Sequence, residues 1–218
     1  MINIAIDGPA GAGKSTVAKA VAKKLGFIYV DTGALYRSIG VNALRHSVAT
    51  DDSEAVVSLL PETNVELKYI DGNQRVFLNG EDVSEEIRLP EASMAASNVS
   101  AIPEVRAFLL DLQRDMAKKN NVVMDGRDIG TVILPDAQYK FFLTATAEVR
   151  AERRYKELQE KGITVDFNEL LEEIKQRDYN DSHRATAPLK QADDAVYVDS
   201  SDLTLEEAIS AIADRIKV

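Results

Sequence analysis

The alternation of apolar and polar residues predicts strands and helices in turn at the start of the chain. Ile2–Ile6 form a short apolar run that stops at Asp7. Apolar residues then recur at helical spacing over residues 17–25, and Gly26 is suited to end that helix. Residues 27–30 are β-branched and aromatic, which predicts a second strand. The chain therefore opens with a strand, a glycine loop, a helix and a strand, the order of a βαβ unit.

The middle of the chain departs from this order. Residues 33–60 have a helical pattern, and Pro61 is expected to stop that helix. Strict alternation follows over residues 65–70, and a second apolar run covers residues 76–78. The turn signals beside these runs are Asp71-Gly72 and Asn79-Gly80. This region is therefore predicted to be a small antiparallel meander inserted into an α/β chain.

The second half of the chain alternates helices and strands again. Helical patterns cover residues 91–97, 104–119, about 147–161 and about 167–179. Strand patterns cover residues 122–125, 139–143 and 195–198. Gly162 is suited to end a helix, and Thr204 with Glu207 forms a capping box for the last one. We predict five mostly parallel strands with helices on both faces, and excursions at about 62–90 and 150–165.

The composition narrows the classes of function. The chain has 218 residues, a length that suits one α/β domain. It carries 26 basic and 36 acidic residues, a formal net charge of −10, which argues against general nucleic-acid or membrane binding. It contains no cysteine, which excludes disulfides and cysteine-ligated zinc. No apolar run approaches the ~18 residues of a membrane span, and the first residues do not resemble a signal peptide, so we expect a cytoplasmic protein.

Residues 8–15 match the phosphate-loop pattern G-x-x-x-x-G-K-[ST] in full. The residues of the loop are Gly8, Pro9, Ala10, Gly11, Ala12, Gly13, Lys14 and Ser15. Glycines allow backbone N–H groups to turn toward a phosphate, Lys14 can reach the β- and γ-phosphates, and Ser15 can ligate Mg²⁺. The alternative is an ordinary glycine turn, but the strand before the loop and the helix after it favour a phosphate loop. Thr16 is a further candidate for nucleotide contact.

Asp125 ends the third predicted strand, where an acidic residue beside a phosphate loop can orient Mg²⁺ through water. The alternative is a solvated aspartate at the end of a strand. Together with the loop, this residue predicts binding of a nucleoside triphosphate with Mg²⁺.

Two arginines follow predicted strands. Arg37 comes shortly after the second strand and Arg127 directly after the third, so both are expected near the carboxyl ends of the strands, where open α/β sheets bind ligands. An arginine there suits bidentate phosphate binding. The alternatives are a helix N-cap at Asp31 or Thr32 and a surface turn in which Arg127 pairs with Asp128.

Two further groups of charged residues have helical spacing. The groups are Arg150, Arg153 and Arg154, and Arg177, Asp181 and Arg184. Mobile arginines can stabilise the charge that phosphoryl transfer spreads over oxygens, which favours a lid role for the first group. The alternative is an exposed helix with pairs such as Arg153 and Glu157. The second group is either an intrahelical salt bridge or a clamp for ribose and phosphate.

With these pieces in place, the sequence resembles the bacterial cytidylate kinases of the nucleoside monophosphate kinase group, nearly from end to end. The motifs that carry the resemblance are IDGPAGAGKST at 6–16, DTGALYR at 31–37, MDGRDIGTVILPDA at 124–137, ERRYKELQEKG at 152–162 and RDYNDSHRATAPL at 177–189. The resemblance implies a P-loop NTPase-type three-layer α/β/α fold with a five-stranded parallel sheet. It implies one domain, residues 1–218, with an acceptor-binding insertion at about 32–100 that carries the antiparallel strands, and a short helical lid at about 150–165.

The same resemblance implies transfer of the γ-phosphoryl of ATP, with Mg²⁺, to CMP or dCMP. Donor phosphates would be held by residues 8–16, and Mg²⁺ by Ser15 and, through water, by Asp125. Acceptor contacts would be made by Thr32, Tyr36, Arg37, Ser97, Arg106, Arg127, Asp128, Arg177, Asp181 and Arg184. In that set Arg37 and Arg127 would hold the CMP phosphate. Ser97, Arg106 and Asp128 would read cytosine and the neighbouring sugar.

The remaining roles implied by the resemblance concern the ribose and the lid. Arg177 and Asp181 would contact the ribose, and Arg184 would lie near the acceptor. Catalysis would rest on Lys14, Arg127, Arg150, Arg153 and Arg154. Thr32 departs slightly from the family, since some members have serine there, but it keeps the hydroxyl.

Two rival functions remain open at this point. One is a P-loop kinase for another small acceptor, such as UMP, AMP or shikimate. The other is a nucleotide-dependent switch with little turnover, although no exposed apolar patch in the sequence suggests a partner. We expect small-molecule substrates, no nucleic-acid or membrane partner, and a monomer.

Overall fold

The computed structural model describes residues 1–70 and 72–217, and the chain forms two compact units. One unit comprises Met1–Tyr29 and Asn120–Val218, and the other comprises Val30–Lys119. Asp71, half of the turn predicted at Asp71-Gly72, lies outside the described residues. The prediction of a single domain with an insertion at about 32–100 and a lid at about 150–165 stays a prediction.

A five-stranded parallel sheet has the strand order β2-β6-β1-β7-β8. Its strands are β1 (Asn3–Asp7), β2 (Ile28–Asp31), β6 (Val122–Gly126), β7 (Tyr139–Thr144) and β8 (Val196–Asp199). β1 pairs in parallel with β6 and β7. Nearly continuous apolar runs such as Ile4, Ala5 and Ile6 are fully buried in this sheet, as expected for parallel strands covered on both faces. β2 carries the chain from the first unit into the second.

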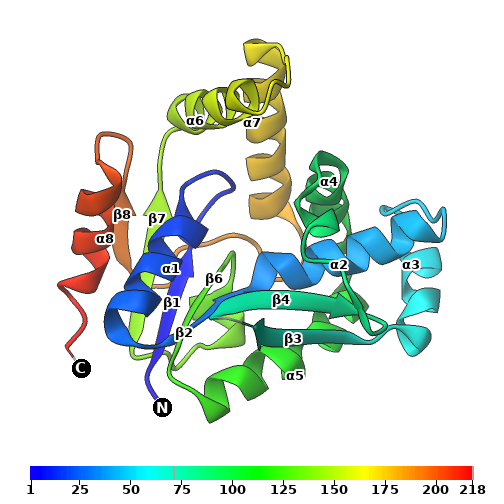
Figure 1. The fold of residues 1–218 in the computed structure, drawn as a ribbon, viewed down its shortest axis with the longest axis horizontal. Coiled ribbons are helices and arrows are strands. Elements are labelled where there is room, and N and C mark those ends of the chain that lie inside the picture. Colours follow the sequence, from blue (N-terminus) through cyan, green and yellow to red (C-terminus); the bar gives the residue numbers. More distant parts are fainter. Residues whose placement is uncertain (71, 218) are drawn as a thin grey trace. The chain divides into compact units, whose positions relative to one another are not determined.

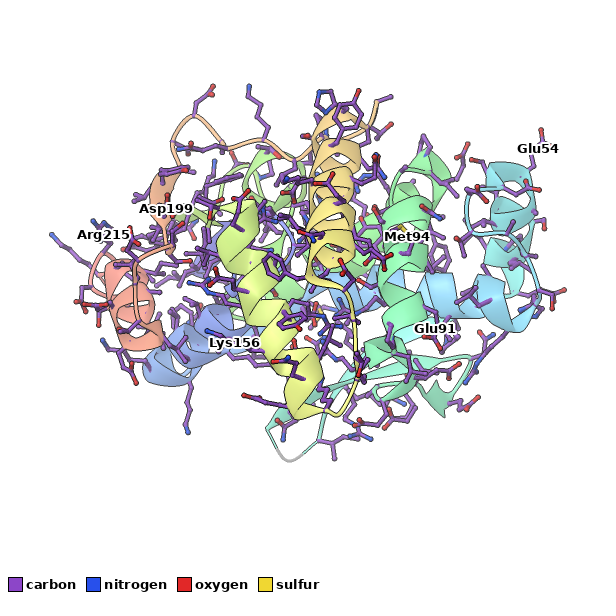
Figure 2. The ribbon with its side chains drawn as sticks, turned by 90° about the horizontal axis from the view of Figure 1, so that it is seen from above. Glu54, Glu91, Met94, Lys156, Asp199 and Arg215 are labelled. Carbon is purple, nitrogen blue, oxygen red and sulfur yellow. The ribbon has the colours of Figure 1, made fainter. Side chains whose placement is uncertain are left out.

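The helices of the first unit include α1 (Lys14–Leu25), α6 (Ala147–Glu160), α7 (Phe167–His183) and α8 (Leu205–Ala213). α1 and α8 lie side by side against the sheet (Figure 1), where Val17, Val21 and Ile212 share one core with Ile6 and Phe141. α6 and α7 also lie side by side, with Lys156 on α6 (Figure 2). A π-helical turn, Ile129–Ile133, follows β6.

Local sequence signals account for the ends of these helices. Gly26 adopts a positive φ of 69° after α1, and its N–H bonds to carbonyls of the last turn. The side chain of Thr204 accepts from the N–H of Glu207, whose carboxylate accepts from Thr204, so the predicted capping box is confirmed. The carboxylate of Asp166 caps α7 by accepting from the N–H groups of Asn168 and Glu169.

The second unit joins helices to a small sheet. Its elements are α2 (Thr32–Arg45), α3 (Ser53–Leu59), a 3-10 helix (Leu60–Glu62), β3 (Val65–Ile70), β4 (Asn73–Leu78), β5 (Glu81–Asp82), a second 3-10 helix (Glu86–Arg88), α4 (Pro90–Val99) and α5 (Pro103–Lys119). β3, β4 and β5 pair as an antiparallel sheet, which confirms the predicted meander. α2 and α4 approach closely at Gly40, because a Cβ there would lie 2.7 Å from the Ala95 methyl carbon.

Two predicted helices have different bounds in the structure. The single helix predicted over residues 33–60 is wrong, since α2 ends at Arg45 and α3 begins at Ser53. Ser47 adopts a positive φ of 56°, which stops the first helix, and the carboxylate of Asp52 caps the second. α7 runs to His183 rather than to residue 179.

The five parallel strands, their connecting helices and the small antiparallel sheet confirm the predicted α/β fold of the P-loop NTPase type. Within the described part of the chain, no helix has the length and apolar character needed to cross a membrane.

Candidate functional site

The phosphate loop connects β1 to α1 and contains three positive φ angles. They belong to Gly8 (149°), Gly11 (75°) and Gly13 (84°), conformations that side-chain-bearing residues rarely adopt. Gly8 also approaches β7 closely, because a Cβ on it would lie 1.9 Å from the Leu143 carbonyl oxygen. The loop therefore needs glycine at Gly8 for both conformation and space.

Lys14 folds back over its own loop. Its Nζ donates to the carbonyl oxygen of Pro9 at 2.7 Å, and the side chain is buried. Burial and the neighbouring charge of Arg127 lower the pKa of Lys14 well below its ordinary value, against the opposing pull of Asp125. A buried cation that lacks a full counter-charge is well prepared to receive phosphate oxygens.

Asp125 is the buried acidic residue at the end of β6. Strand register pairs it with Ile6, just before the loop. Its carboxylate accepts from the Ser15 hydroxyl and from the Tyr29 hydroxyl, both at 2.9 Å. Asp125 is 4% exposed, so the alternative of a solvated strand-end residue is wrong. Tyr29 was recognised from the sequence only as a strand residue, since its contact depends on the pairing of strands.

Arg127 and Asp128, which follow β6, pair with one residue near the end of α7 and with the residue that follows it. Arg127 Nε donates to Asp181 at 2.8 Å, and Arg184 Nη2 donates to Asp128 at 3.3 Å. Burial alone would raise the pKa of Asp181, but Arg127, with Arg177 and Arg184, holds it below its ordinary value. These two pairs join distant segments, rather than forming within one helix or one turn as the simplest sequence alternatives proposed.

Asp7 is a site residue that the sequence analysis missed. Its two carboxylate oxygens accept the backbone N–H groups of Ile129 and Gly130 at 2.7 and 2.8 Å. Burial raises the pKa of Asp7 to about 7, against the effect of these two hydrogen bonds. Asp7 thereby fastens the turn that carries Arg127 to the end of β1. The apolar run that ends in this acid was the only sequence signal.

The three arginines of α6 enter different environments although their spacing suggested one shared face. Arg150 is buried, and it donates to the Ala10 carbonyl at 2.9 Å and to Asp178 at 3.0 Å. Arg153 donates to the carbonyl of Ser200 at 2.6 Å.

Arg154 forms a surface pair with Glu157 at 2.8 Å, so this arginine, and not Arg153, makes the predicted pair with that glutamate. Of the three arginines, Arg150 is the one that contacts the phosphate loop directly, through the carbonyl of Ala10.

In the second unit, two arginines converge on one carboxylate oxygen. Arg37 Nη2 and Arg88 Nη2 lie 2.8 and 3.1 Å from Asp31 Oδ2, while Asp31 Oδ1 accepts the Ala34 N–H and caps α2. Burial would raise the pKa of Asp31, but Arg37, Arg88 and the Ala34 N–H hold it below its ordinary value. Gln74 accepts from the Asp31 N–H at 3.0 Å. The predicted N-cap is therefore Asp31, and Thr32 is the first helical residue.

The remaining predicted acceptor residues also belong to this unit. Arg106 is buried, with its guanidinium 5.6 Å from the centre of the Tyr36 ring, and it donates to the Ser100 carbonyl at 3.3 Å. Ser97 is buried on α4, and its carbonyl accepts from the Ser100 hydroxyl. Thr32 is buried at the start of α2. Arg106 and Ser97 are thus linked through Ser100.

Replacement of Asp31 by asparagine tests the charge of this cluster. Asparagine keeps the cap on Ala34 but leaves Arg37 and Arg88 without a counter-charge. We expect a loss of about 3 kcal/mol of unfolding free energy at pH 7. Because the folded-state pKa of Asp31 is depressed, this stabilisation is present above the ordinary value of about 3.9 and is lost as pH falls through the folded-state pKa. Urea unfolding at pH 7 and pH 3 should therefore show the two proteins converging in acid.

The matched control is Asp115→Asn. Asp115 pairs with Lys118 on the surface of α5, so its loss should change stability little at either pH. A wild-type advantage that stays constant from pH 7 to pH 3 would contradict the assignment.

The central strand of a five-stranded parallel sheet leads into a glycine phosphate loop, and Ser15 of that loop donates a hydrogen bond to the buried Asp125. This combination defines a P-loop phosphotransferase. A family model described as cytidylate kinase matches residues 4–218. The chain belongs to the cytidylate kinase family. The cytidylate kinase of Caldicellulosiruptor saccharolyticus is 55% identical over 213 residues, 98% of this chain and 94% of the relative.

A second relative supports this membership, and a solved structure shares the fold. The cytidylate kinase of Caldanaerobacter subterraneus subsp. tengcongensis is 56% identical over 216 residues, covering 99% of this chain and 95% of the relative. A solved structure of an uncharacterized protein from Eubacterium ventriosum aligns with a TM-score of 0.52 at 16% identity, covering 99% of this chain and 100% of that chain. This last likeness concerns the fold alone.

Proposed function

We propose that the protein transfers the γ-phosphoryl of ATP to CMP or dCMP and releases ADP with CDP or dCDP. The observation that carries the proposal is the 55–56% identity to cytidylate kinases over nearly the whole chain. The loop around Lys14 supports the donor half of the reaction. The arginine clusters around Asp31 and Asp181 support binding of a second anionic substrate.

The donor would bind as its Mg²⁺ complex. The Ser15 hydroxyl and the Asp125 carboxylate are hard oxygen donors held together at 2.9 Å, which fits Mg²⁺. In the described residues, no three His, Cys, Asp or Glu side chains gather as a metal cage. This also fits Mg²⁺, which usually keeps water and substrate phosphates as ligands. When bound, the ion would neutralise charge on the β- and γ-phosphate oxygens.

Arg37 and Arg127 would hold the acceptor phosphate. Arg37 uses Nη2 on Asp31, while its buried Nε has no hydrogen-bond acceptor among the described residues. A phosphate oxygen would satisfy this buried donor, and an unsatisfied one costs about 1–3 kcal/mol. The ribose would be contacted by Arg177 and Asp181, and Arg184 with Asp128 would lie near the acceptor.

The base would be read by Ser97 and Arg106, with Tyr36 and Thr32 beside them. Arg106 is fixed by the Tyr36 ring and the Ser100 carbonyl, so its remaining N–H groups have a defined direction. A pocket whose buried donors match cytosine rejects uracil, because uracil presents the opposite donor pattern and leaves those groups unpaired.

Catalysis would consist of positioning and charge stabilisation. Lys14 would hold the transferring phosphoryl, and Arg127 would approach it beside the acceptor phosphate. Arg150 would act through the phosphate loop that it braces, while Arg153 and Arg154 would complete the lid. Closure of such a lid excludes water, which would otherwise consume ATP without transfer.

An acceptor panel tests this function. ADP release is followed with ATP·Mg²⁺ and, in parallel, CMP, dCMP, UMP, AMP and GMP. Fast turnover confined to CMP and dCMP is the expected result. Turnover with another nucleotide would support a kinase but contradict the assignment of a cytosine pocket. No turnover with any acceptor would favour a nucleotide-binding switch.

Arg106→Ala should raise the KM for CMP about tenfold and weaken discrimination against UMP, because one charge-assisted contact to the base is lost. The measurement is kcat/KM for CMP and UMP in the same assay. Arg114→Ala on the same helix is the control, and we expect it to leave both values unchanged. Unchanged values in Arg106→Ala would remove Arg106 from base recognition.

The predictions of a cytoplasmic location and of a monomer stay predictions. Light scattering on the purified protein would measure the second directly.

A further inference from the structure

The carboxylate of Asp125 accepts hydrogen bonds from two different elements of the first unit. The Ser15 hydroxyl donates to Asp125 Oδ2 at 2.9 Å, and the Tyr29 hydroxyl donates to Asp125 Oδ1 at 2.9 Å. In the sheet, β6 lies between β1 and β2. Ser15 belongs to the first turn of α1, which follows β1 and the phosphate loop, whereas Tyr29 belongs to β2. Each oxygen of this carboxylate is therefore oriented by its own hydroxyl donor.

The ring of Tyr29 is itself held in place. Tyr29 is half-buried and packs against the core cluster that contains Val17 and Val21 of α1. Lys19 Nζ lies 5.5 Å from the centre of the Tyr29 ring, a cation–π contact. Lys19 comes one turn after Ser15, so both lie on the same side of α1. A ring contacted by the core and by this lysine gives its hydroxyl a defined direction.

The orientation of Asp125 matters for the metal that the donor nucleotide would bring. Mg²⁺ requires near-octahedral geometry and keeps several water ligands, so a carboxylate that binds such a water must point in a fixed direction. Asp125 is 4% exposed, so protein hydroxyl groups rather than bulk water set that direction. A carboxylate can accept about four hydrogen bonds. Accepting from Ser15 and Tyr29 is therefore compatible with accepting from a metal-bound water as well.

From this geometry we infer that Tyr29 is a positioning residue for Mg²⁺ binding, because its hydroxyl holds the Asp125 carboxylate in the orientation that binds the metal-bound water. The inference rests on the proposed function, which assigns Mg²⁺ to Ser15 and Asp125. Tyr29 acts through Asp125 and not on the nucleotide. Removal of a group that orients a metal ligand typically weakens metal binding or activity by about 10–100-fold.

Tyr29→Phe tests the inference, because it removes the hydroxyl and keeps the ring that Lys19 and the core contact. Binding of adenylyl imidodiphosphate, a non-hydrolysable ATP analogue, is measured by calorimetry in EDTA and at increasing Mg²⁺ concentrations. The apparent dissociation constant of Mg²⁺ from the enzyme–nucleotide complex should rise about tenfold. The affinity for the analogue in EDTA should change little. Phosphoryl transfer by this variant should be slow at limiting Mg²⁺ and should recover at saturating Mg²⁺, with an unchanged KM for CMP.

Tyr139→Phe is the matched control. Tyr139 packs against the same core cluster as Tyr29, and its hydroxyl donates to the Lys217 carbonyl at 2.8 Å. This variant also loses one tyrosine hydroxyl and one hydrogen bond of the first unit. It should leave the Mg²⁺ constant unchanged, and the melting temperatures of both variants show how much each hydroxyl contributes to stability alone.

An Mg²⁺ constant in Tyr29→Phe that equals the wild-type value would overturn the inference. Equal weakening of analogue binding with and without Mg²⁺ would overturn it too, because Tyr29 would then support only the fold of the loop. The acceptor panel tests the proposed function separately. A wild-type protein that phosphorylates no nucleotide but shows the expected Mg²⁺ shift would refute the proposed function and support the role of Tyr29.

Discussion

Replacement of Lys14 by alanine is expected to lower kcat by on the order of 10³. Lys14 is the buried cation of the phosphate loop, with its Nζ 2.7 Å from the Pro9 carbonyl. Negative charge develops on the transferring phosphoryl, and Lys14 is the lysine that belongs to the phosphate-loop motif itself. The measurement is single-turnover and steady-state transfer from ATP·Mg²⁺ to CMP.

The loss should come from chemistry rather than from unfolding. Burial already lowers the pKa of Lys14, so the fold gains little from its charge. Lys14→Met keeps the aliphatic stem and should melt near the wild-type temperature while losing the same activity. Lys24→Ala, an exposed lysine near the end of the same helix, should leave kcat unchanged. A Lys14→Ala enzyme within tenfold of the wild-type kcat would contradict this role.

Gly8→Ala is expected to destabilise the first unit strongly. The added Cβ would lie 1.9 Å from the carbonyl oxygen of Leu143, a backbone atom that cannot move without disturbing β7. The φ of 149° adds conformational strain for any side-chain-bearing residue. Together these effects should cost at least about 3 kcal/mol of unfolding free energy. Urea unfolding followed by circular dichroism measures the loss.

Gly162→Ala is the control that separates backbone strain from the steric clash expected in Gly8→Ala. Gly162 also has a positive φ, 73°, but a Cβ there would meet nothing within 4 Å. That variant should lose only about 1 kcal/mol, the ordinary difference between glycine and alanine at such a position. Comparable losses in the two alanine variants would show that the contact with Leu143 is not what requires glycine at Gly8.

Much of the fold followed from local patterns. The parallel strands appeared as short apolar runs, the antiparallel meander as alternation with turn residues, and the last helix as a capping box. Each of these signals lies within a few residues, so chain neighbours alone decide it. The one helix predicted over residues 33–60 failed because apolar spacing continues across Ser47, where the backbone turns to a positive φ.

Local sequence patterns were not sufficient to predict the partners of the arginines. Helical spacing placed Arg150, Arg153 and Arg154 together, but the structure sends them to Asp178, Ser200 and Glu157. The angle of a side chain around a helix is set by spacing. Its partner is set by whatever packs against that helix, and those groups come from distant segments.

By itself, the sequence determined that the chain has an α/β fold with a phosphate loop between a strand and a helix. It also showed several arginines that suit the binding of anionic substrates. The tertiary structure alone decided which acids hold those arginines. Asp31 binds Arg88, which lies 57 residues further along the chain, and Asp7 fastens the turn at Ile129 across 122 residues. A loop motif is specified by consecutive residues, whereas the pairing of buried charges depends on strand order and helix packing, which no short segment specifies.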